Sequence, residues 1–144
     1  MKILLTGGGG YIGTRLSQLL LSKGDEVTIL DDFRFGESPA LPAIIDGATV
    51  VRGDVRDREL LRGLASSCDA VVHLAAIVGY PACAADPHEA RSVNVDGARS
   101  VSEAVRAGTR FIYASTGSVY GKLDSTCTET SPTNAVSLYG QTML

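Results

Sequence analysis

Short apolar runs and amphipathic segments alternate along the whole chain. Five runs have the length and composition of β-strands, at residues 3–5, 27–30, 48–51, 70–74 and 111–114. The first amphipathic segment is expected to be a helix that ends at Gly24. Its apolar residues at helical spacing are Ile12, Leu16, Leu19 and Leu20. The alternation predicts an α/β fold with a parallel sheet.

A glycine-rich turn joins the first strand to the first helix. Its sequence is Thr6-Gly7-Gly8-Gly9-Gly10-Tyr11-Ile12-Gly13. Such a turn brings the backbone close to a phosphate without a Cβ in the way, and the helix then offers unpaired N–H groups and the positive end of its dipole. Gly7, Gly10 and Gly13 therefore predict dinucleotide binding on a Rossmann-like, doubly wound sheet with strand order 3-2-1-4-5. A flexible loop is the alternative.

Two acidic residues, Asp31 and Asp32, end the second strand about 20 residues beyond the glycines. An acid at this place binds the hydroxyl pair of a ribose. Asp31 favours NAD over NADP, because its carboxylate repels a 2′-phosphate. Arg34 keeps NADP as an alternative cofactor, since a nearby arginine can bind the 2′-phosphate. The alternative for Asp31 is a solvated turn residue.

The third strand is followed by another acidic turn and a helix. A loop with a short helix is expected before it, over residues 35–47. Asp54 follows the strand at the sheet edge where ligands of α/β sheets bind, and either contacts adenine or is a plain turn residue. Asp57 is expected to cap the helix. The apolar residues that this helix turns to the sheet are Leu60, Leu61 and Leu64.

The fourth strand is apolar almost throughout, which suits burial on both faces. Within it, His73 is interpreted as a hydrogen-bonded core residue, with a catalytic base as the alternative. Residues 77–85 are expected to form a loop whose small and apolar side chains line a substrate pocket.

The helix after that loop has clear start signals and one polar residue on its apolar face. Asp86 is expected to be the N-cap, with Pro87 in the first helical position, Glu89 completing a capping box and Gly108 ending the helix. Its buried stripe is Ala90, Val93, Gly97, Ala98, Val101, Ala104 and Val105. Asn94 lies on this stripe. It either holds backbone or water near a site or occupies a partly exposed edge.

The fifth strand runs into a segment rich in hydroxyl groups, Ser115-Thr116-Gly117-Ser118-Val119-Tyr120-Gly121. Hydroxyls at this end of a strand either bind a substrate oxygen or cap backbone groups. A polar loop is expected over residues 122–133, and a helix from about Ser137 that contains Tyr139.

Composition narrows the classes of function. Of 144 residues, 44% are hydrophobic and 20% charged, as in a single globular domain with a real core. The net charge of −3 offers no positive surface for nucleic acid or an anionic membrane, and no apolar run is long enough to span a bilayer. Cys68, Cys83 and Cys127 lack metal-ligand spacing, so we expect no metal site and reduced thiols in a cytoplasmic protein.

Taken together, these motifs resemble the extended short-chain dehydrogenase/reductase family, the NAD-dependent nucleotide-sugar epimerases and dehydratases. Several independent motifs carry the resemblance, in the right order along the chain. They are Thr6–Gly13, Asp31, Gly53-Asp54-Val55, His73-Leu74-Ala75-Ala76, Asn94-Val95-Asp96-Gly97, Ser115-Thr116, Val119-Tyr120-Gly121 and Tyr139-Gly140.

The resemblance implies that NAD is the cofactor and that hydride passes between a sugar carbon and nicotinamide. Tyr139, the first residue of the family's Tyr-x-x-x-Lys motif, would be the base, and Thr116 would bind the reacting hydroxyl. The residues then expected at the cofactor are Gly7, Gly10, Tyr11, Ile12, Gly13, Asp31, Asp32, Asp54, Val55, Leu74, Ala75, Ala76, Asn94 and Tyr139.

One position departs from the family, because Met143 stands where the family has lysine. That lysine grips the nicotinamide ribose and lowers the pKa of the tyrosine; bringing a phenol from about 10 to about 7 takes roughly 4 kcal/mol. Methionine has neither charge nor donor, although the positive nicotinamide ring would supply part of the shift. Met143 therefore indicates unusual chemistry, a different base or a lost activity.

The family continues beyond the last predicted helix with further strands and a substrate-binding region. We therefore interpret residues 1–144 as an NAD-binding Rossmann domain, the N-terminal part of a longer enzyme whose C-terminal part is missing here. We expect a nucleotide-linked sugar as substrate and a homodimer of the full-length protein, without nucleic-acid or membrane partners. The alternatives are an NAD-binding regulatory or catalytically altered member of the same fold, which Met143 favours, and a structural remnant that binds no nucleotide.

Overall fold

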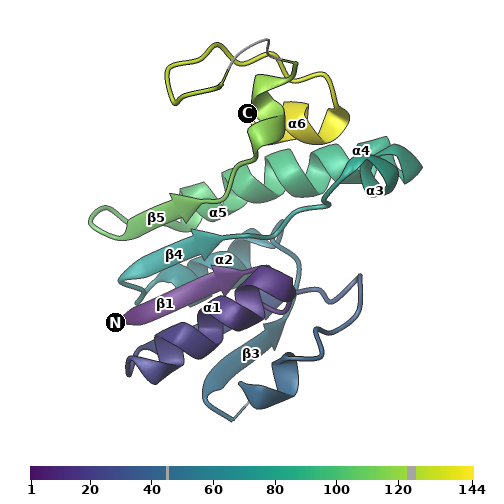
Figure 1. The fold of residues 1–144 in the computed structure, drawn as a ribbon. Helices are drawn as coiled ribbons and strands as arrows, with labels where there is room; N and C mark the ends of the chain where they lie inside the picture. Colours follow the sequence, from purple (N-terminus) through teal and green to yellow (C-terminus); the bar gives the residue numbers. More distant parts are fainter. Residues whose placement is uncertain (45, 123–125) are drawn as a thin grey trace. The chain divides into compact units, whose positions relative to one another are not determined.

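The computed structural model describes residues 1–44, 46–122 and 126–144 (Figure 1). The chain forms two compact units. We call Met1–Ala75 with Gly97–Ala114 the sheet unit, and Ala76–Asp96 with Ser115–Leu144 the helical unit.

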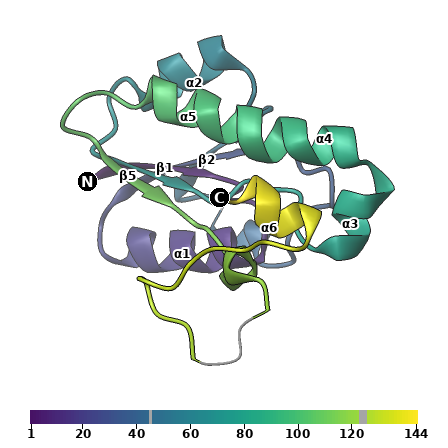
Figure 2. The same cartoon turned by 90° about the horizontal axis from the view of Figure 1, so that it is seen from above.

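Five parallel strands form the sheet of the sheet unit: β1 (Lys2–Thr6), β2 (Glu26–Asp31), β3 (Ala48–Arg52), β4 (Ala70–His73) and β5 (Arg110–Tyr113). Their order is β3-β2-β1-β4-β5. Helix α1 (Tyr11–Ser22) covers one face, and α2 (Arg58–Ala65) and α5 (Ala98–Ala104) cover the other (Figure 2). The predicted fold class and strand order are confirmed.

The core of the sheet unit lies along the central strands. Leu4, Leu5 and Val71 are fully buried in β1 and β4, and Ile29 and Leu30 in β2. All four residues of β4 are buried, as the continuous apolar run predicts. Because these strands are parallel, the polar turns that follow them all leave the sheet at the same edge, the carboxyl ends of the strands.

The predicted first helix is present as α1, but not all of its apolar residues at helical spacing are buried. Ile12 and Leu19 are exposed, whereas Gly13, Thr14 and Ser17 are buried. Small residues of α1 form its close contact with the rest of the sheet unit. The larger apolar residues of the helix lie beside this contact or point outward. Its end is as predicted, because Gly24 has a φ of +81° and donates its N–H to the carbonyl of Leu21.

The connections around β3 follow the sequence signals. A single 3₁₀ turn, η1 (Leu41–Ala43), interrupts the predicted loop, in which residue 45 lies outside the described residues. The carboxylate of Asp57 accepts the N–H groups of Glu59 and Leu60, which confirms it as the N-cap of α2. Leu61 of this helix is fully buried.

The helical unit contains a helix that the sequence prediction missed. Residues 77–85 were expected to form a loop, but α3 (Tyr80–Ala85) occupies most of this segment. Pro81 lies in the first turn of α3, where a missing N–H costs nothing, and alanines favour the helix after it. The other elements are α4 (Pro87–Arg91), the 3₁₀ turn η3 (Gly117–Tyr120) and α6 (Leu138–Thr142).

The helix expected from Pro87 to Gly108 is not regular. Asp86 caps α4 through the N–H of Glu89, as predicted, but α4 passes into a π-helical segment, η2 (Ser92–Gly97), before α5. The helix ends at Ala104, because Val105 is extended. The predicted buried stripe is otherwise largely confirmed, with Ala90, Val93, Val101 and Ala104 buried. A π-helical segment changes which side chains point inward, often at functional sites.

The polar loop predicted over residues 122–133 includes 123–125, which lie outside the described residues. Ser137 caps α6 by accepting the N–H of Gly140, as the predicted helix start requires. None of the helices in the described part of the chain has the length and apolar character that crossing a membrane demands.

Candidate functional site

The glycine turn of the sheet unit has the geometry that its sequence predicts. Gly7 has a φ of +70°, and its N–H donates to the carbonyl of Leu30 at 2.8 Å. A Cβ added there would lie 2.6 Å from the backbone nitrogen of Ala75, so both conformation and space require glycine. Two expected cofactor residues, Gly7 and Ala75, are thus in direct backbone contact.

Helix α1 starts directly at this turn. Gly10 is its N-cap in an extended conformation, without a side-chain cap. A Cβ at Gly13 would lie 2.5 Å from Cα of Gly8, so the close approach that this glycine permits is to the turn itself. Tyr11 and Ile12 are 92% and 65% exposed. The helix therefore begins with accessible backbone, as an anion site at a helix N-terminus needs.

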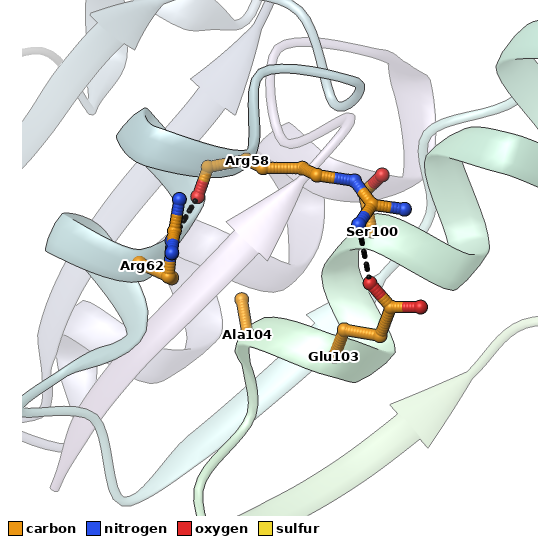
Figure 3. Close-up of a pocket in the computed structure, with 5 residues that line it drawn as sticks. All are labelled: Arg58, Arg62, Ser100, Glu103 and Ala104. Carbon is orange, nitrogen blue, oxygen red and sulfur yellow. Dashed lines mark hydrogen bonds and ion pairs between the residues drawn. The ribbon is translucent and has the colours of Figure 1, made fainter.

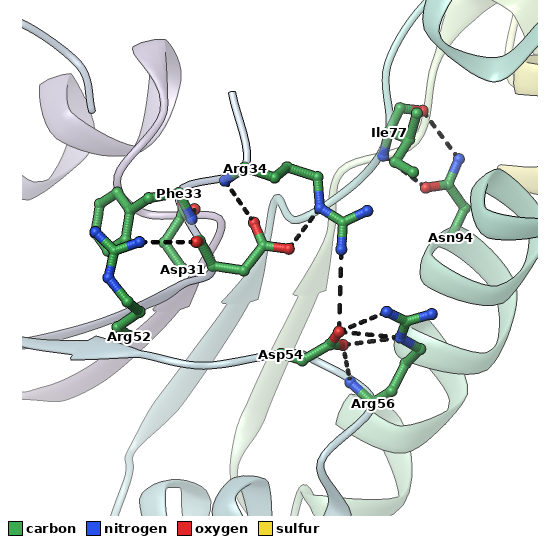
Figure 4. A network of polar contacts seen from close by, with 9 residues as sticks. Asp31, Phe33, Arg34, Arg52, Asp54, Arg56, Ile77 and Asn94 are labelled. Carbon is green, nitrogen blue, oxygen red and sulfur yellow. Dashed lines mark hydrogen bonds and ion pairs between the residues drawn. The ribbon is translucent and has the colours of Figure 1, made fainter. Parts of the chain in front are cut away.

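Asp31 lies at the end of β2 and holds the glycine turn. Its Oδ2 accepts the N–H of Gly9 at 3.0 Å, and its Oδ1 accepts the N–H of Phe33 at 2.8 Å. Phe33 has a φ of +56°, which is unusual for a large side chain, and the Arg52 guanidinium lies 4.6 Å from its ring centre (Figure 4). Asp31 is thus half-buried, and backbone N–H groups fix both of its oxygens.

Asp32 and Asp54 belong to a second polar network in the same unit (Figure 4). Asp32 accepts hydrogen bonds from the backbone N–H and the Nε of Arg34, and an Arg34 Nη lies 3.9 Å from Oδ2 of Asp54. Arg56 binds both carboxylate oxygens of Asp54. This hydrogen-bonded guanidinium holds the pKa of the Asp54 carboxyl below its ordinary value, against the effect of burial.

The remaining expected cofactor residues differ in their surroundings. Val55 is buried and packs on Gly97, where an added Cβ would lie 2.7 Å from a Val55 methyl group. Leu74 is half-buried and donates its N–H to the carbonyl of Thr6 at 2.9 Å. Ala76 is half-buried in the helical unit.

His73 is confirmed as a core residue. It is 2% exposed, its Nδ1 is hydrogen-bonded to the hydroxyl of Thr6, and its ring stacks on Tyr113 with centroids 5.7 Å apart. Burial lowers the pKa of His73 from 6.5 to about 4. The side chain is therefore neutral at physiological pH.

Asn94, in η2, is buried at 1% exposure, so the alternative of a partly exposed edge position is wrong. Its Oδ1 accepts the N–H of Ile77 at 2.7 Å, and its Nδ2 donates to the Ile77 carbonyl at 3.1 Å and to the Thr142 hydroxyl at 2.9 Å. Asn94 therefore ties the segment before α3 to the last turn of α6.

Thr116 and Tyr139 meet in the helical unit. The Thr116 hydroxyl lies near enough to the phenol of Tyr139 to lower its pKa, and it also accepts the N–H of Ser118 at 3.2 Å. Burial raises the pKa of Tyr139; the hydrogen bond from Thr116 opposes that shift, and the nearby Cys83 adds to it. At neutral pH the phenol keeps its proton.

Met143 is the C-cap of α6 and is 5% exposed. Its carbonyl accepts a hydrogen bond from the hydroxyl of Ser115 at 2.9 Å. This bond joins the hydroxyl-rich segment to the end of α6, and so Ser115 has a structural partner while Thr116 faces the phenol. The position of the family lysine is thus an apolar, buried side chain.

A separate surface pocket of about 180 Å³ lies between α2 and α5 of the sheet unit (Figure 3). Its lining residues are Arg58, Arg62, Ser100, Glu103 and Ala104. Arg58 and Glu103 form an ion pair across it at 2.9 Å. It shares no residue with the sites described above.

Several residues of the site were not found from the sequence. Arg56 follows Asp54 by two residues, a spacing that indicates an Asx-type turn and would have suggested this pair. Phe33 and Thr142 gave no comparable signal, because each has a partner, Arg52 or Asn94, that only the folded chain brings near.

Comparison with known proteins places these features in a family. A model described as the NAD dependent epimerase/dehydratase family matches residues 3–144. The chain is 34% identical to a UDP-glucose 4-epimerase from Streptomyces lividans and 35% identical to a dTDP-glucose 4,6-dehydratase from Mycolicibacterium smegmatis, over 99% of its length in each case. It covers 44% and 45% of those two proteins, so it spans a little under half of their length.

A solved structure agrees with this result. The UDP-glucose-4-epimerase from Stenotrophomonas maltophila, crystallised with bound NAD and formylated UDP-arabinopyranose, superposes with a TM-score of 0.90 at 28% identity. The match covers 99% of this chain and 45% of that one. On the strength of a family match that extends over almost every residue, this chain belongs to the NAD dependent epimerase/dehydratase family.

Proposed function

We propose that residues 1–144 are the NAD-binding Rossmann domain of a nucleotide-sugar epimerase- or dehydratase-type oxidoreductase, the N-terminal part of a longer enzyme. Family membership and the relatives named above support the reaction class. The observation that carries the proposal within the chain is the pairing of Thr116 with Tyr139 in one unit and of Asp31 with the glycine turn in the other.

The residues of the sheet unit fit an NAD molecule. Each carboxylate oxygen of Asp31 accepts one backbone N–H and keeps a lone pair for a ribose hydroxyl. Gly7, Gly10 and Gly13 would bring the backbone and the start of α1 to the pyrophosphate. The other residues assigned to the cofactor are Tyr11, Ile12, Asp32, Asp54, Val55, Leu74, Ala75, Ala76, Asn94 and Tyr139.

The catalytic assignment is that Tyr139 moves the proton and Thr116 positions the substrate. NAD, when bound, supplies the acceptor for a hydride from the sugar carbon. Thr116 binds the reacting hydroxyl, and Tyr139 takes its proton, so that a carbonyl is left on the sugar. The phenol must lose its own proton first, and burial works against that loss.

Met143 supports a second candidate, an NAD-binding regulatory or catalytically altered member of the family. A buried methionine supplies no charge beside Tyr139. In this case the sheet unit binds NAD as proposed, while sugar oxidation at neutral pH is slow or absent. For both candidates we expect a cytoplasmic protein and a homodimer at full length.

Native mass spectrometry of the protein purified from its own source tests the cofactor assignment. We expect a subunit well above 15.0 kDa with co-purifying NAD. A protein that carries no nucleotide, even after NAD is added, would contradict both candidates.

Nucleotide-sugar assays then separate the two candidates. UDP- and dTDP-hexoses are incubated with the NAD-loaded protein and followed by nicotinamide absorbance and product chromatography. Turnover that is lost in Tyr139→Phe supports the enzyme. Tight NAD binding without turnover, in the original chain and in Met143→Lys, supports the regulatory candidate.

A further inference from the structure

The segment that follows β2 contains the group that a 2′-phosphate would need. Arg34 lies three residues beyond Asp31, and a guanidinium there is suited to a phosphate because its fork of donors matches phosphate oxygens. Selection between NAD and NADP therefore depends on what Arg34 is bound to, as well as on the charge of Asp31.

Arg34 is held by two carboxylates. Its Nε and its backbone N–H both bind Asp32, so that the side chain and the turn are fixed by the same acid. An Nη of Arg34 lies 3.9 Å from Asp54 (Figure 4). Asp54 is itself fixed by Arg56 through both of its oxygens. Asp32 and Asp54 thus direct the Arg34 guanidinium toward themselves.

The other arginine near this segment is engaged as well. Arg52, at the end of β3, donates to the carbonyl of Asp32 at 3.1 Å, pairs with Glu37 at 3.2 Å and lies over the ring of Phe33. Its contacts hold the backbone of the segment from Asp32 to Glu37. Neither arginine is therefore presented to a ligand without first leaving a carboxylate.

We propose that Asp32 and Asp54 form an ionic lock on Arg34, and that this lock is a determinant of NAD selection alongside Asp31. Asp31 repels a 2′-phosphate directly. The lock withholds the cation that would compensate for the repulsion. The proposal rests on the proposed function, because it assigns specificity to the same cofactor site.

The two contributions are separable because they act on different groups. Asp31→Asn removes the repulsion and keeps an oxygen acceptor for one of the two backbone N–H groups that Asp31 binds. Asp32→Asn keeps the acceptor for the N–H of Arg34 but removes the charge that holds its guanidinium. Only Asp32→Asn removes the ion pair between Asp32 and Arg34. Any gain in NADP affinity from this change must therefore disappear when Arg34 is also replaced.

The test measures dissociation constants for NAD and NADP by isothermal titration calorimetry, with AMP and adenosine 2′,5′-bisphosphate as probes that lack nicotinamide. We expect Asp32→Asn to bind NADP about three- to tenfold more tightly than the original protein. The double variant Asp32→Asn/Arg34→Ala should lose that gain. Glu37→Gln is the matched control, since it removes an acid from the Arg52 pair on the same segment.

The outcomes distinguish the lock from the proposed function. A gain in NADP affinity that requires Arg34 and is absent in Glu37→Gln supports the lock. Unchanged NADP affinity in Asp32→Asn, or an equal gain in Glu37→Gln, overturns the lock and leaves NAD binding intact. Failure of the original protein to bind either dinucleotide overturns the proposed function, and the lock with it.

Discussion

The two units hold their candidate functional residues by different physical means. In the sheet unit, Asp32 and Asp54 are paired with arginines, and Asp31 is held by backbone N–H groups. In the helical unit, Asn94 and Thr116 hold their neighbours through uncharged hydrogen bonds. Charge is therefore abundant where a phosphate-bearing cofactor is proposed, whereas position 143, where the family has a lysine, holds an uncharged buried methionine.

This difference separates the two halves of the proposed function, cofactor binding and sugar oxidation. A charged, backbone-fixed region is preorganised for binding, because its groups need little rearrangement when a ligand arrives. A half-buried tyrosine whose pKa is raised keeps its proton and is a proton donor at neutral pH rather than a base. These residues are therefore better arranged for the proposed cofactor binding than for the proposed sugar oxidation. The following changes test that contrast, from the largest expected effect to the smallest.

Gly7→Val should distort the glycine turn and so abolish the proposed cofactor binding. A Cβ would lie 2.6 Å from the backbone of Ala75, and a β-branched residue at a φ of +70° is strained. We expect the free energy of unfolding to fall by about 4 kcal/mol or more and NAD affinity to fall at least ~100-fold. Urea denaturation and calorimetry measure the two effects.

Gly63 provides the control for that substitution. It lies inside α2, and an added Cβ would meet nothing within 4 Å. Gly63→Ala should leave NAD affinity unchanged and raise stability by up to about 1 kcal/mol, since alanine is the better helix former. Equal losses in both variants would contradict the special role of Gly7.

Asn94→Ala should disrupt the helical unit without touching the charged network. The change leaves the buried N–H and carbonyl of Ile77 without their partner. We expect a loss of about 3–4 kcal/mol in the free energy of unfolding. Asn94→Asp retains an oxygen that accepts the Ile77 N–H, so its free energy of unfolding should differ from that of Asn94→Ala. If both variants were as stable as the original chain, Asn94 would have no structural role.

His73 should make the stability of the sheet unit dependent on pH. Its pKa is about 4 in the folded chain and 6.5 ordinarily, so the unfolded chain binds more protons between these values. Stability is fully present above pH 6.5 and is lost as the pH falls through 4, by about 3 kcal/mol. Urea denaturation across this window measures the loss. His73→Gln should flatten the dependence, whereas replacement of the exposed His88 should not.

Met143→Lys should restore a positive charge at the position where the family has lysine. A cation beside Tyr139 favours phenolate, and we expect the phenolate fraction at neutral pH to rise by about ten- to a hundredfold. Ultraviolet difference absorbance across a pH titration measures the phenolate directly, with Tyr139→Phe as the blank. Met143→Gln is the neutral control. Identical titrations of the two Met143 variants would show that position 143 does not act on Tyr139.

The local features of this fold are those that the sequence determines best. Alternating apolar runs gave the strands, and the glycines and acids marked the turns and caps, because a residue's own conformational preferences act at those points. Gly7 and Asp57 behave as predicted for this reason. The predictions failed where packing overrides local preference: α3 replaces most of a predicted loop, and a π-helical segment interrupts a predicted helix.

The sequence by itself determined the glycine turn, the acid at the end of β2, the strand order and the family resemblance. Tertiary structure alone decided which distant partners Asn94 and Arg34 bind. Asn94 binds partners 17 and 48 residues away, and Arg34 reaches Asp54 on another strand's end. Contacts between residues far apart in the chain depend on the packing of whole elements, and a linear pattern contains no record of which polar atoms that packing brings within hydrogen-bonding distance.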